Sequence, residues 1–171
     1  LQSVGKPMPE LQAGLFSPPA GLRRGVVKCR VVYDSAGVCE VEFAAYTPRV
    51  IRTLKVVGDD DIVYPYKYAD RSMLMKLYEK RSDCDEVLIV KNGFLTDTSY
   101  SNVVLSRGGA FYTPDTYLLN GTKRRFLLQQ GLIRECRVRV ADLYTYDRVY
   151  LINAMLDLED EVAIPADRVV K

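Results

Sequence analysis

Residues 86–102, with the sequence EVLIVKNGFLTDTSYSN, decide the fold that we expect for this 171-residue chain. The apolar, β-branched run Glu86–Lys91 predicts a short strand. Asn92-Gly93 is the strongest two-residue hairpin signal, so the chain should return as a strand over Phe94–Thr96. The polar segment Thr96–Asn102 follows directly, before another apolar run. This order places hydroxyl, amide and carboxyl side chains between apolar strands.

Two helices and further strands are expected on either side of this hairpin. Asp70–Cys84 carries an apolar stripe at helical spacing, with Asp70 or Ser72 as its N-cap. Thr122–Gln130 is a second helical segment, stopped by Gly131. The mixed order of elements predicts an α+β fold. Strand patterns cover Val26–Tyr33, Val38–Phe43, Arg49–Val57, Val103–Ser106, Ala110–Thr113, Arg134–Val140, Arg148–Ile152 and a short stretch around Ile164.

The N-terminal residues differ in composition from the rest of the chain. Residues 1–21 hold four of the eight prolines, which predicts an irregular lead-in. We therefore expect two parts, the lead-in over residues 1–21 and a main domain over residues 22–171. The first residue is Leu rather than Met, so the sequence leaves open whether residues are missing before it.

The composition excludes several classes of function. The chain has 24 Lys and Arg against 22 Asp and Glu, a net charge of +2, which is too balanced to indicate a nucleic-acid or membrane partner. It has no histidine, which excludes Ser-His-Asp catalysis, Cys-His catalysis and Cys2His2 zinc sites. No apolar window reaches the roughly 18 residues of a membrane span, and no signal peptide is visible. We expect a cytoplasmic protein without a metal.

The four cysteines predict no zinc site, because no two of them form a Cys-x-x-Cys pair. Two disulfides are an alternative, but a domain of this size does not need them. We expect reduced thiols that are buried, because free cysteine is among the most buried residue types. The cysteines are Cys29, Cys39, Cys84 and Cys136.

Three segments are candidates for chemistry, and each also has a purely structural interpretation. Lys67 stands among three tyrosines before a helix, where burial would lower its pKa and make it a nucleophile, unless it is a surface lysine. Thr96–Asn102 could bind a polar ligand or form an exposed turn. Asn120–Arg125 opens a helix with free N–H groups that suit a phosphate, or is an ordinary helix start. Taken singly, these signals are weak.

Together, the order and spacing of these segments resemble the class IV aminotransferase family of pyridoxal-phosphate enzymes. That family includes branched-chain and D-amino acid aminotransferases and aminodeoxychorismate lyase. The resemblance covers roughly residues 22–165. It rests on Lys67-Tyr68-Ala69-Asp70-Arg71, on Thr96–Asn102 after its Asn-Gly turn, on Tyr112-Thr113-Pro114, on Asn120-Gly121-Thr122-Lys123-Arg124 and on Leu151-Ile152-Asn153-Ala154-Met155.

The resemblance implies a fold and a cofactor. The fold would be the barrel-like large domain of the D-amino acid aminotransferase-like enzymes, with the small N-terminal domain reduced or missing and residues 1–21 as its remnant. The cofactor would be pyridoxal 5'-phosphate, bound covalently by Lys67, with Asp97 facing its pyridine nitrogen. The family usually has Glu in the place of Asp97. The residues implied for the phosphate are Gly121, Thr122, Lys123, Asn153 and Ala154.

The substrate site is implied less directly. Arg30 and Tyr100 would face a small amino substrate, and the family implies a homodimer. Arg30 lies in a strand opposite Glu40 or Glu42, so a cross-strand ion pair is its alternative role.

Two details resemble the lyase branch of the family. Asn120–Phe126 resembles the phosphate helix of aminodeoxychorismate lyase, and Asn153-Ala154-Met155 resembles its Asn-Ala-Leu turn. The helix opens Gly-Thr-Lys, however, where the family usually has Gly-Ile-Thr or Gly-Ile-Met. The implied activity is release of pyruvate and formation of p-aminobenzoate for folate synthesis. Two alternatives stay open: a class IV amino acid aminotransferase, and a shortened, non-catalytic homologue that acts as a dimeric module.

Overall fold

The structure is a computed structural model that describes residues 13–171, and its contacts divide the chain into two compact units after Arg49. The first described elements are two short 3-10 helices, η1 (Ala13–Phe16) and η2 (Ala20–Leu22). The remaining part of the expected lead-in, residues 1–12, lies outside the described residues. The boundary between the two units therefore lies after Arg49, whereas the sequence analysis placed the start of the main domain at residue 22. That residues 22–171 form a cofactor-binding domain stays a prediction.

The first unit contains a β-hairpin, as the sequence predicts. Strands β1 (Val27–Asp34) and β2 (Gly37–Ala45) pair antiparallel. Asp34 closes the turn, because its carboxylate accepts the N–H groups of Ala36 and Gly37 at 2.7 and 3.2 Å. No residue from 14 to 49 is buried. A two-stranded ribbon leaves its side chains open to solvent, so this unit contributes nothing to the buried core.

The second unit, residues 50–171, holds the other elements and the core. Its strands are β3 (Leu54–Gly58), β4 (Glu86–Lys91), β5 (Phe94–Leu95), β6 (Asn102–Arg107), β7 (Ala110–Pro114), β8 (Arg134–Cys136), β9 (Arg148–Ile152), β10 (Ala163–Pro165) and β11 (Val169–Val170). Its helices are α1 (Ser72–Glu79), α2 (Thr122–Gln129) and the 3-10 helices η3 (Val140–Thr145), η4 (Leu158–Asp160) and η5 (Ala166–Arg168).

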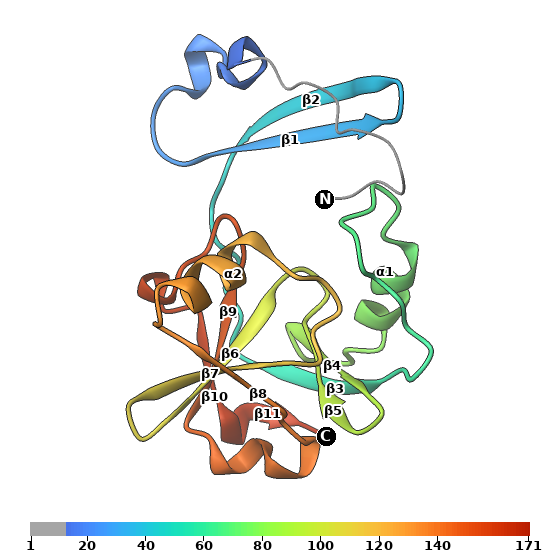
Figure 1. The fold of residues 1–171 in the computed structure, drawn as a ribbon, viewed down its shortest axis with the longest axis vertical. Coiled ribbons are helices and arrows are strands. Elements are labelled where there is room, and N and C mark those ends of the chain that lie inside the picture. The colour runs from blue at the N-terminus through green and yellow to red at the C-terminus, as the bar shows by residue number, and fades with distance from the viewer. Residues whose placement is uncertain (1–12) are drawn as a thin grey trace. The chain divides into compact units, whose positions relative to one another are not determined.

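These strands form a curled sheet made of two parts (Figure 1). One part has the order β11-β3-β4-β5 and the other has the order β10-β9-β6-β7-β8. The chain that leaves β8 joins the two parts, because Leu95 N–H donates to Val138 O at 2.9 Å and Phe94 bridges Arg139. The strands at the two ends, β10 and β11, are neighbours in sequence. The α+β, barrel-like fold that we expected is confirmed.

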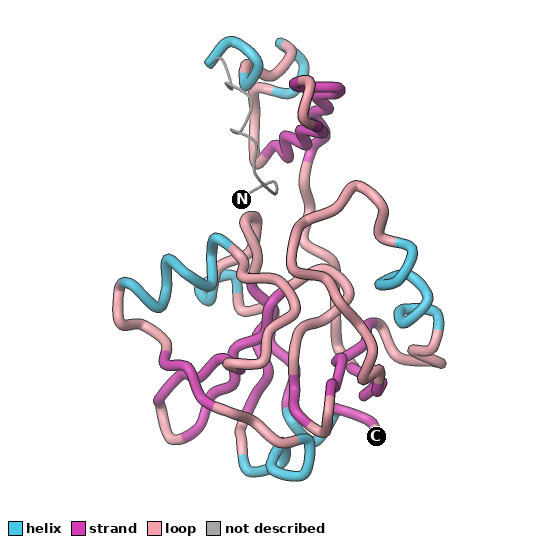
Figure 2. The backbone as a smooth tube through the Cα atoms, turned by 45° about the vertical axis from the view of Figure 1, so that its right-hand side comes forward, coloured by secondary structure: helices cyan, strands magenta, loops and turns pink. Residues whose placement is uncertain are grey.

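Side chains alternate along the strands and divide the core into a barrel interior and two outer faces. In β4, Leu88 faces the interior, whereas Val87 and Ile89 pack with α1. In β6, Val104 packs with Leu127 of α2. Burying one such side chain contributes about 1.5–3 kcal/mol. The two helices therefore both lie outside the barrel and cover different flanks of it (Figure 1, Figure 2).

Strand β3 starts later than the sequence predicts, at Leu54 instead of Arg49. The N–H groups of Arg52 and Thr53 donate to the Asp85 carboxylate, at 2.8 and 3.0 Å, and not to a neighbouring strand. This contact is remote in sequence, so a local strand pattern could not reveal it.

The predicted Asp70–Cys84 helix and Arg134–Val140 strand are also shorter in the structure. Helix α1 starts at Ser72, whose N–H donates to the Asp70 carboxylate at 2.8 Å, and it ends at Glu79. Strand β8 stops at Cys136, and the chain beyond it crosses to β5 and then enters η3. Within residues 13–171, no helix has the length and apolar character needed to cross a bilayer.

The cysteines are free, but the predicted burial is wrong. Cys29 and Cys39 are exposed, and Cys84 and Cys136 are half-buried. The first two lie on the hairpin of the first unit, where a two-stranded ribbon offers them no core.

Candidate active site

A buried carboxylate lies just beyond β5. Asp97 is 5% exposed. Its Oδ2 accepts the N–H groups of Leu118 and Leu119 at 3.0 and 2.9 Å, and its Oδ1 accepts the side-chain amide of Asn102 at 2.8 Å. Burial raises the pKa of Asp97 to about 6, although these hydrogen bonds favour the ionised form. A carboxylate offers about four acceptor positions, so one remains for a further donor.

Asn102 joins the segments around this carboxylate. Its amide group also donates to Leu119 O at 2.8 Å, and its Oδ1 lies 2.1 Å from where a Cβ of residue 121 would be. Any larger residue at position 121 would therefore displace the Asn102 side chain. In the β6–β9 pair, Asn102 lies opposite Ile152, which is the residue that precedes Asn153 in the sequence. The sequence analysis gave Asn102 no role of its own; its place in the polar Thr96–Asn102 segment was the available signal.

The N-terminus of α2 opens next to this cluster. Gly121 is its N-cap and offers no side chain to the first N–H groups, which suits an anion. Lys123 forms an ion pair with Asp157 and so ties α2 to the chain after β9. In that chain, Asn153 Oδ1 accepts the N–H of Met155 at 2.8 Å. The segments that contain the predicted phosphate residues, Gly121, Thr122, Lys123, Asn153 and Ala154, thus lie together beside Asn102.

Arg124 is a buried cation to which the sequence analysis gave no separate role. Its guanidinium donates to Pro114 O at 2.9 Å and to Thr113 Oγ1 at 3.3 Å, and it pairs with Glu135. It also lies over the ring of Tyr117 at 4.1 Å. These contacts direct the side chain toward β7 and β8. Arg124 therefore fixes the start of α2 against the barrel, and the Gly-x-x-Arg pattern was its signal in the sequence.

Lys67 lies in the loop between β3 and α1. It is the central residue of a γ-turn, which the Tyr68 N–H closes onto Tyr66 O at 2.9 Å. The hydroxyl of buried Tyr64 donates to Tyr68 O at 3.2 Å and supports the same turn. Lys67 is exposed, so the desolvated amine considered from the sequence is wrong. Its role as the cofactor lysine stays a prediction.

Arg71 links this loop to the buried cluster. Its guanidinium donates to Ser99 O at 2.7 Å. Ser99 lies two residues after Asp97, within a turn that Thr98 and Ser101 close by a backbone hydrogen bond of 2.9 Å and a hydroxyl contact of 2.7 Å. This bond connects the loop of Lys67 to the segment of Asp97.

The two residues predicted to face the substrate have structural contacts of their own. Arg30 pairs with Glu40 at 3.0 Å and with Glu42 at 2.8 Å, so the cross-strand ion pair is confirmed. Its hydrogen bond with Glu42 raises the pKa of Arg30. Tyr100 is half-buried and packs against the barrel interior. Substrate contact stays a prediction for both residues, and Arg30 belongs to the first unit.

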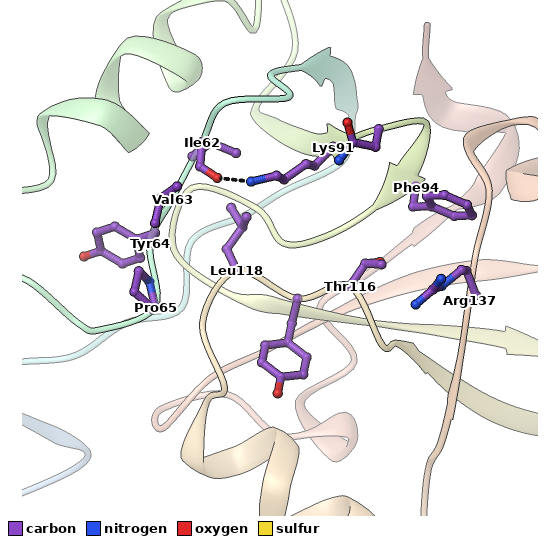
Figure 3. Close-up of a pocket in the computed structure, with 11 residues that line it drawn as sticks. Ile62, Val63, Tyr64, Pro65, Lys91, Phe94, Thr116, Leu118 and Arg137 are labelled. Atoms are coloured by element: carbon purple, nitrogen blue, oxygen red, sulfur yellow. Dashed lines mark hydrogen bonds between the residues drawn. The ribbon is translucent and has the colours of Figure 1, made fainter. Parts of the chain in front are cut away.

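A cavity of about 430 Å³ opens between the loop before Lys67 and the loop before α2 (Figure 3). Tyr64 and Leu118 line it, and so does Lys91, whose ammonium donates to Ile62 O at 2.6 Å. Leu118 also donates its N–H to Asp97, so the cavity shares a wall with the cluster. Lys67 does not line this cavity. Within residues 13–171, no group of three or more acidic or thiol side chains is placed to hold a metal ion.

The family comparison covers the candidate site. Residues 66–158 match the model of the amino-transferase class IV family. This stretch includes the loop of Lys67, the Asp97 cluster, the start of α2 and the turn at Asn153. A protein of Haemophilus influenzae that has not been characterised is 40% identical over 141 residues, which are 82% of this chain and 74% of that protein.

Solved structures share the fold. A Haemophilus somnus protein, proposed to be a 4-amino-4-deoxychorismate lyase, is 36% identical with a TM-score of 0.74, over 78% of this chain and 68% of that chain. A Mesorhizobium loti protein, proposed to be an amino-acid aminotransferase, is 20% identical with a TM-score of 0.68, over 81% and 71% of the two chains. The second likeness concerns the fold alone. From the match over residues 66–158 and these relatives, we conclude that the chain belongs to the amino-transferase class IV family.

Proposed function

We propose that this chain is a pyridoxal-phosphate enzyme that acts as an aminodeoxychorismate lyase, releasing pyruvate and forming p-aminobenzoate for folate synthesis. The observation that carries the cofactor assignment is the cluster at Asn102, where a buried carboxylate and an uncapped helix start lie together. The lyase assignment is supported by the 36% identity to the Haemophilus somnus protein proposed to have that activity.

The residues of this cluster fit a phosphorylated pyridine at both of its ends. Asp97 retains one acceptor position, which is enough for the single N–H of a protonated pyridine ring. The first N–H groups of α2 receive no side-chain cap from Gly121 and can donate to phosphate oxygens. Lys123 lies in the first turn of this helix, where its ammonium pairs with Asp157 and its backbone N–H faces no side-chain cap.

Asp97 would keep a proton on the pyridine nitrogen. When bound, the cofactor supplies an electron sink for the negative charge that develops at the α-carbon of an amino substrate. An ionised carboxylate beside the ring nitrogen favours the protonated ring, which is the stronger sink. Burial raises the pKa of Asp97 to about 6, which still leaves it ionised at neutral pH. Its three hydrogen bonds fix the carboxylate before any substrate arrives, so no reorganisation is needed.

Lys67 would bind the cofactor through its amine and then move a proton at the α-carbon of the substrate. These two tasks require an amine that can change position on a backbone that does not. The γ-turn and the Tyr64 hydroxyl hold the backbone, and the side chain of Lys67 is exposed. Thr122, Lys123 and Ala154 would bind the phosphate through their N–H groups, and Asn153 would shape the turn beside them.

The experiment that tests the lyase assignment compares two products. Purified protein loaded with pyridoxal 5'-phosphate is given aminodeoxychorismate without any keto acid, and pyruvate and p-aminobenzoate are measured. We expect both products, and we expect neither with Lys67→Ala. A parallel reaction contains an amino acid and an added keto acid. Amino-group transfer in this second reaction, without pyruvate release from aminodeoxychorismate in the first, would overturn the lyase assignment in favour of an aminotransferase. No turnover by either route would favour the non-catalytic homologue.

We further propose that the protein is a cytoplasmic homodimer that acts on a small amino substrate without nucleic-acid or membrane partners. The balanced charge of +2 supports the absence of a polyanionic partner. Light scattering of the purified protein should give twice the mass of one chain, and a mass of one chain would contradict the dimer.

A further inference from the structure

Side chains from two other elements hold the backbone of Ser99. Its N–H donates to Glu86 Oε1 at 3.3 Å, and its carbonyl accepts the Arg71 guanidinium at 2.7 Å. Glu86 is fully buried at the start of β4, where Oε1 also accepts the N–H of Val87 at 2.9 Å. A buried carboxyl group that loses its donors is left unsatisfied, which is costly, so it stays where they are. Glu86 therefore fixes Ser99 to the barrel.

Arg71 extends this anchor to the loop of Lys67. It stands at the start of α1, four residues after Lys67. Its bond to Ser99 is charge-assisted, which is the stronger class of hydrogen bond, and a guanidinium keeps its charge at any working pH. Buried Tyr64, which precedes Lys67, donates its hydroxyl to Tyr68 O, which follows it, and Arg71 also interacts with this hydroxyl. Lys67 thus lies between two attachment points, and only the one at Arg71 leads to the segment of Asp97.

We propose that Arg71 is a positioning residue that, through Ser99, keeps the backbone of Lys67 at a fixed distance from Asp97. The inference rests on the proposed function, because it concerns the lysine that binds the cofactor. Along the chain, Lys67 and Asp97 are separated by α1, β4 and β5. The Arg71–Ser99 bond bypasses these elements, since each partner lies within four residues of one of the two site residues. Without it, the exposed loop can shift while the buried carboxylate stays in place.

The first test follows hydrogen exchange in the protein without cofactor. Arg71→Ala is compared with Arg81→Ala as a matched control. Arg81 lies just beyond the C-terminal end of α1, and its guanidinium donates to Tyr78 O at 3.2 Å. We expect Arg71→Ala to speed exchange about tenfold in peptides 63–71 and 97–102, the scale of one charge-assisted bond. Arg81→Ala should leave both peptides unchanged. Wild-type exchange in both peptides of Arg71→Ala would overturn the proposal.

The second test locates the attached cofactor by borohydride reduction and peptide mapping. We expect labelling of Lys67 to slow about tenfold in Arg71→Ala and to stay at the wild-type rate in Arg81→Ala. Arg71→Lys keeps a charged donor and should restore part of the rate, which a general loss of folding would not permit. Wild-type labelling in Arg71→Ala would overturn the positioning role. Absence of Lys67 labelling in the wild-type protein would instead overturn the proposed function, while the hydrogen-exchange result would still decide whether Arg71 holds both segments.

Discussion

The segment around Asp97 and the loop around Lys67 are built in opposite ways. Residues 95–99 are buried, and the Asp97 carboxylate accepts three hydrogen bonds. In the loop, Tyr64 is buried but Lys67 is exposed, and hydrogen bonds to the backbone hold its turn. The fixed charge of the candidate site is therefore preorganised by the chain itself, whereas the amine is presented on an open loop.

This difference matches the two kinds of work that the proposed chemistry requires. A charge that stabilises developing charge acts best when it does not move, because reorganisation adds to the barrier. A lysine that binds a cofactor and later transfers a proton has to move between positions. Substitutions in the Asp97 segment should therefore have larger effects than substitutions in the loop that spare Lys67 and Arg71.

The largest effect is expected for Asp97→Asn. The amide cannot hold a proton on the pyridine nitrogen by charge, so we expect kcat to fall about a hundredfold or more while the cofactor remains bound. Steady-state assays and cofactor absorbance measure the two properties. Asp115→Asn is the control, because Asp115 pairs with the exposed Arg137 and should keep its activity. Full activity in Asp97→Asn would make Asp97 a residue of the turn alone.

The pH dependence of stability should also separate wild type from Asp97→Asn. Burial raises the pKa of Asp97 from 3.8 to about 6, so the folded state keeps a proton that the unfolded state releases. The contribution of Asp97 to the free energy of unfolding is then greatest below about pH 4 and is lost as the pH rises through about 6. The shift corresponds to about 3 kcal/mol.

Denaturant unfolding of both proteins between about pH 3 and about pH 8 measures this difference, because every other carboxylate is common to the pair. If the free energy of unfolding of wild type, relative to that of Asp97→Asn, increased as the pH rises, this would contradict the raised pKa of Asp97. It would show that the hydrogen bonds to the carboxylate outweigh its burial.

A smaller effect is expected for Gly121→Ala. The new Cβ would lie 2.1 Å from Asn102 Oδ1, so Asn102 must move away from Asp97. We expect the free energy of unfolding to fall by about 1–3 kcal/mol, the scale of overpacking a fitted site. Gly58→Ala is the control, because nothing lies within 4 Å of the added atom there. Equal stability of the two variants in urea would show that Asn102 can move freely.

The smallest effect is expected for Tyr64→Phe, which removes the hydrogen bond to Tyr68 O. We expect a loss of about 0.5–1.5 kcal/mol in stability and no loss of cofactor attachment. Tyr66→Phe, the control, removes a hydroxyl of the same loop that has no hydrogen-bond partner within residues 13–171, and it should behave as wild type. A loss of stability in Tyr64→Phe that exceeds the loss in Gly121→Ala would break the contrast between the two regions.

The fold could be predicted from the sequence where the signals are local. Asn92 and Gly93 have φ angles of 51° and 78°, as the Asn-Gly hairpin signal requires. Gly131, with φ of 69°, ends α2 where it was expected to. The start of β3 could not be predicted, because Asp85 decides it from a distant position. The exposure of Cys29 depends on the number of strands beside it, which its own strand does not reveal.

The sequence drew attention to the residues of the candidate site but not to their connections. Asp97 stood out because six polar side chains follow one another in seven residues. The contacts of Asn102 with Leu119 and Gly121, and the bond from Arg71 to Ser99, join segments that are far apart in sequence. Such pairings need the topology first, because the spacing along a single chain does not say which loops meet.

The most direct test of the central claim, that Lys67 binds pyridoxal 5'-phosphate beside Asp97, is a titration followed by visible absorbance. Wild type, Lys67→Ala and Lys91→Ala are titrated side by side. Lys91 is the matched control, because its ammonium is engaged by Ile62 O in the neighbouring cavity. We expect the visible absorption band of lysine-bound pyridoxal 5'-phosphate in wild type and Lys91→Ala, and we expect no such band in Lys67→Ala. A band that persists in Lys67→Ala, or that is absent from wild type, would contradict the claim.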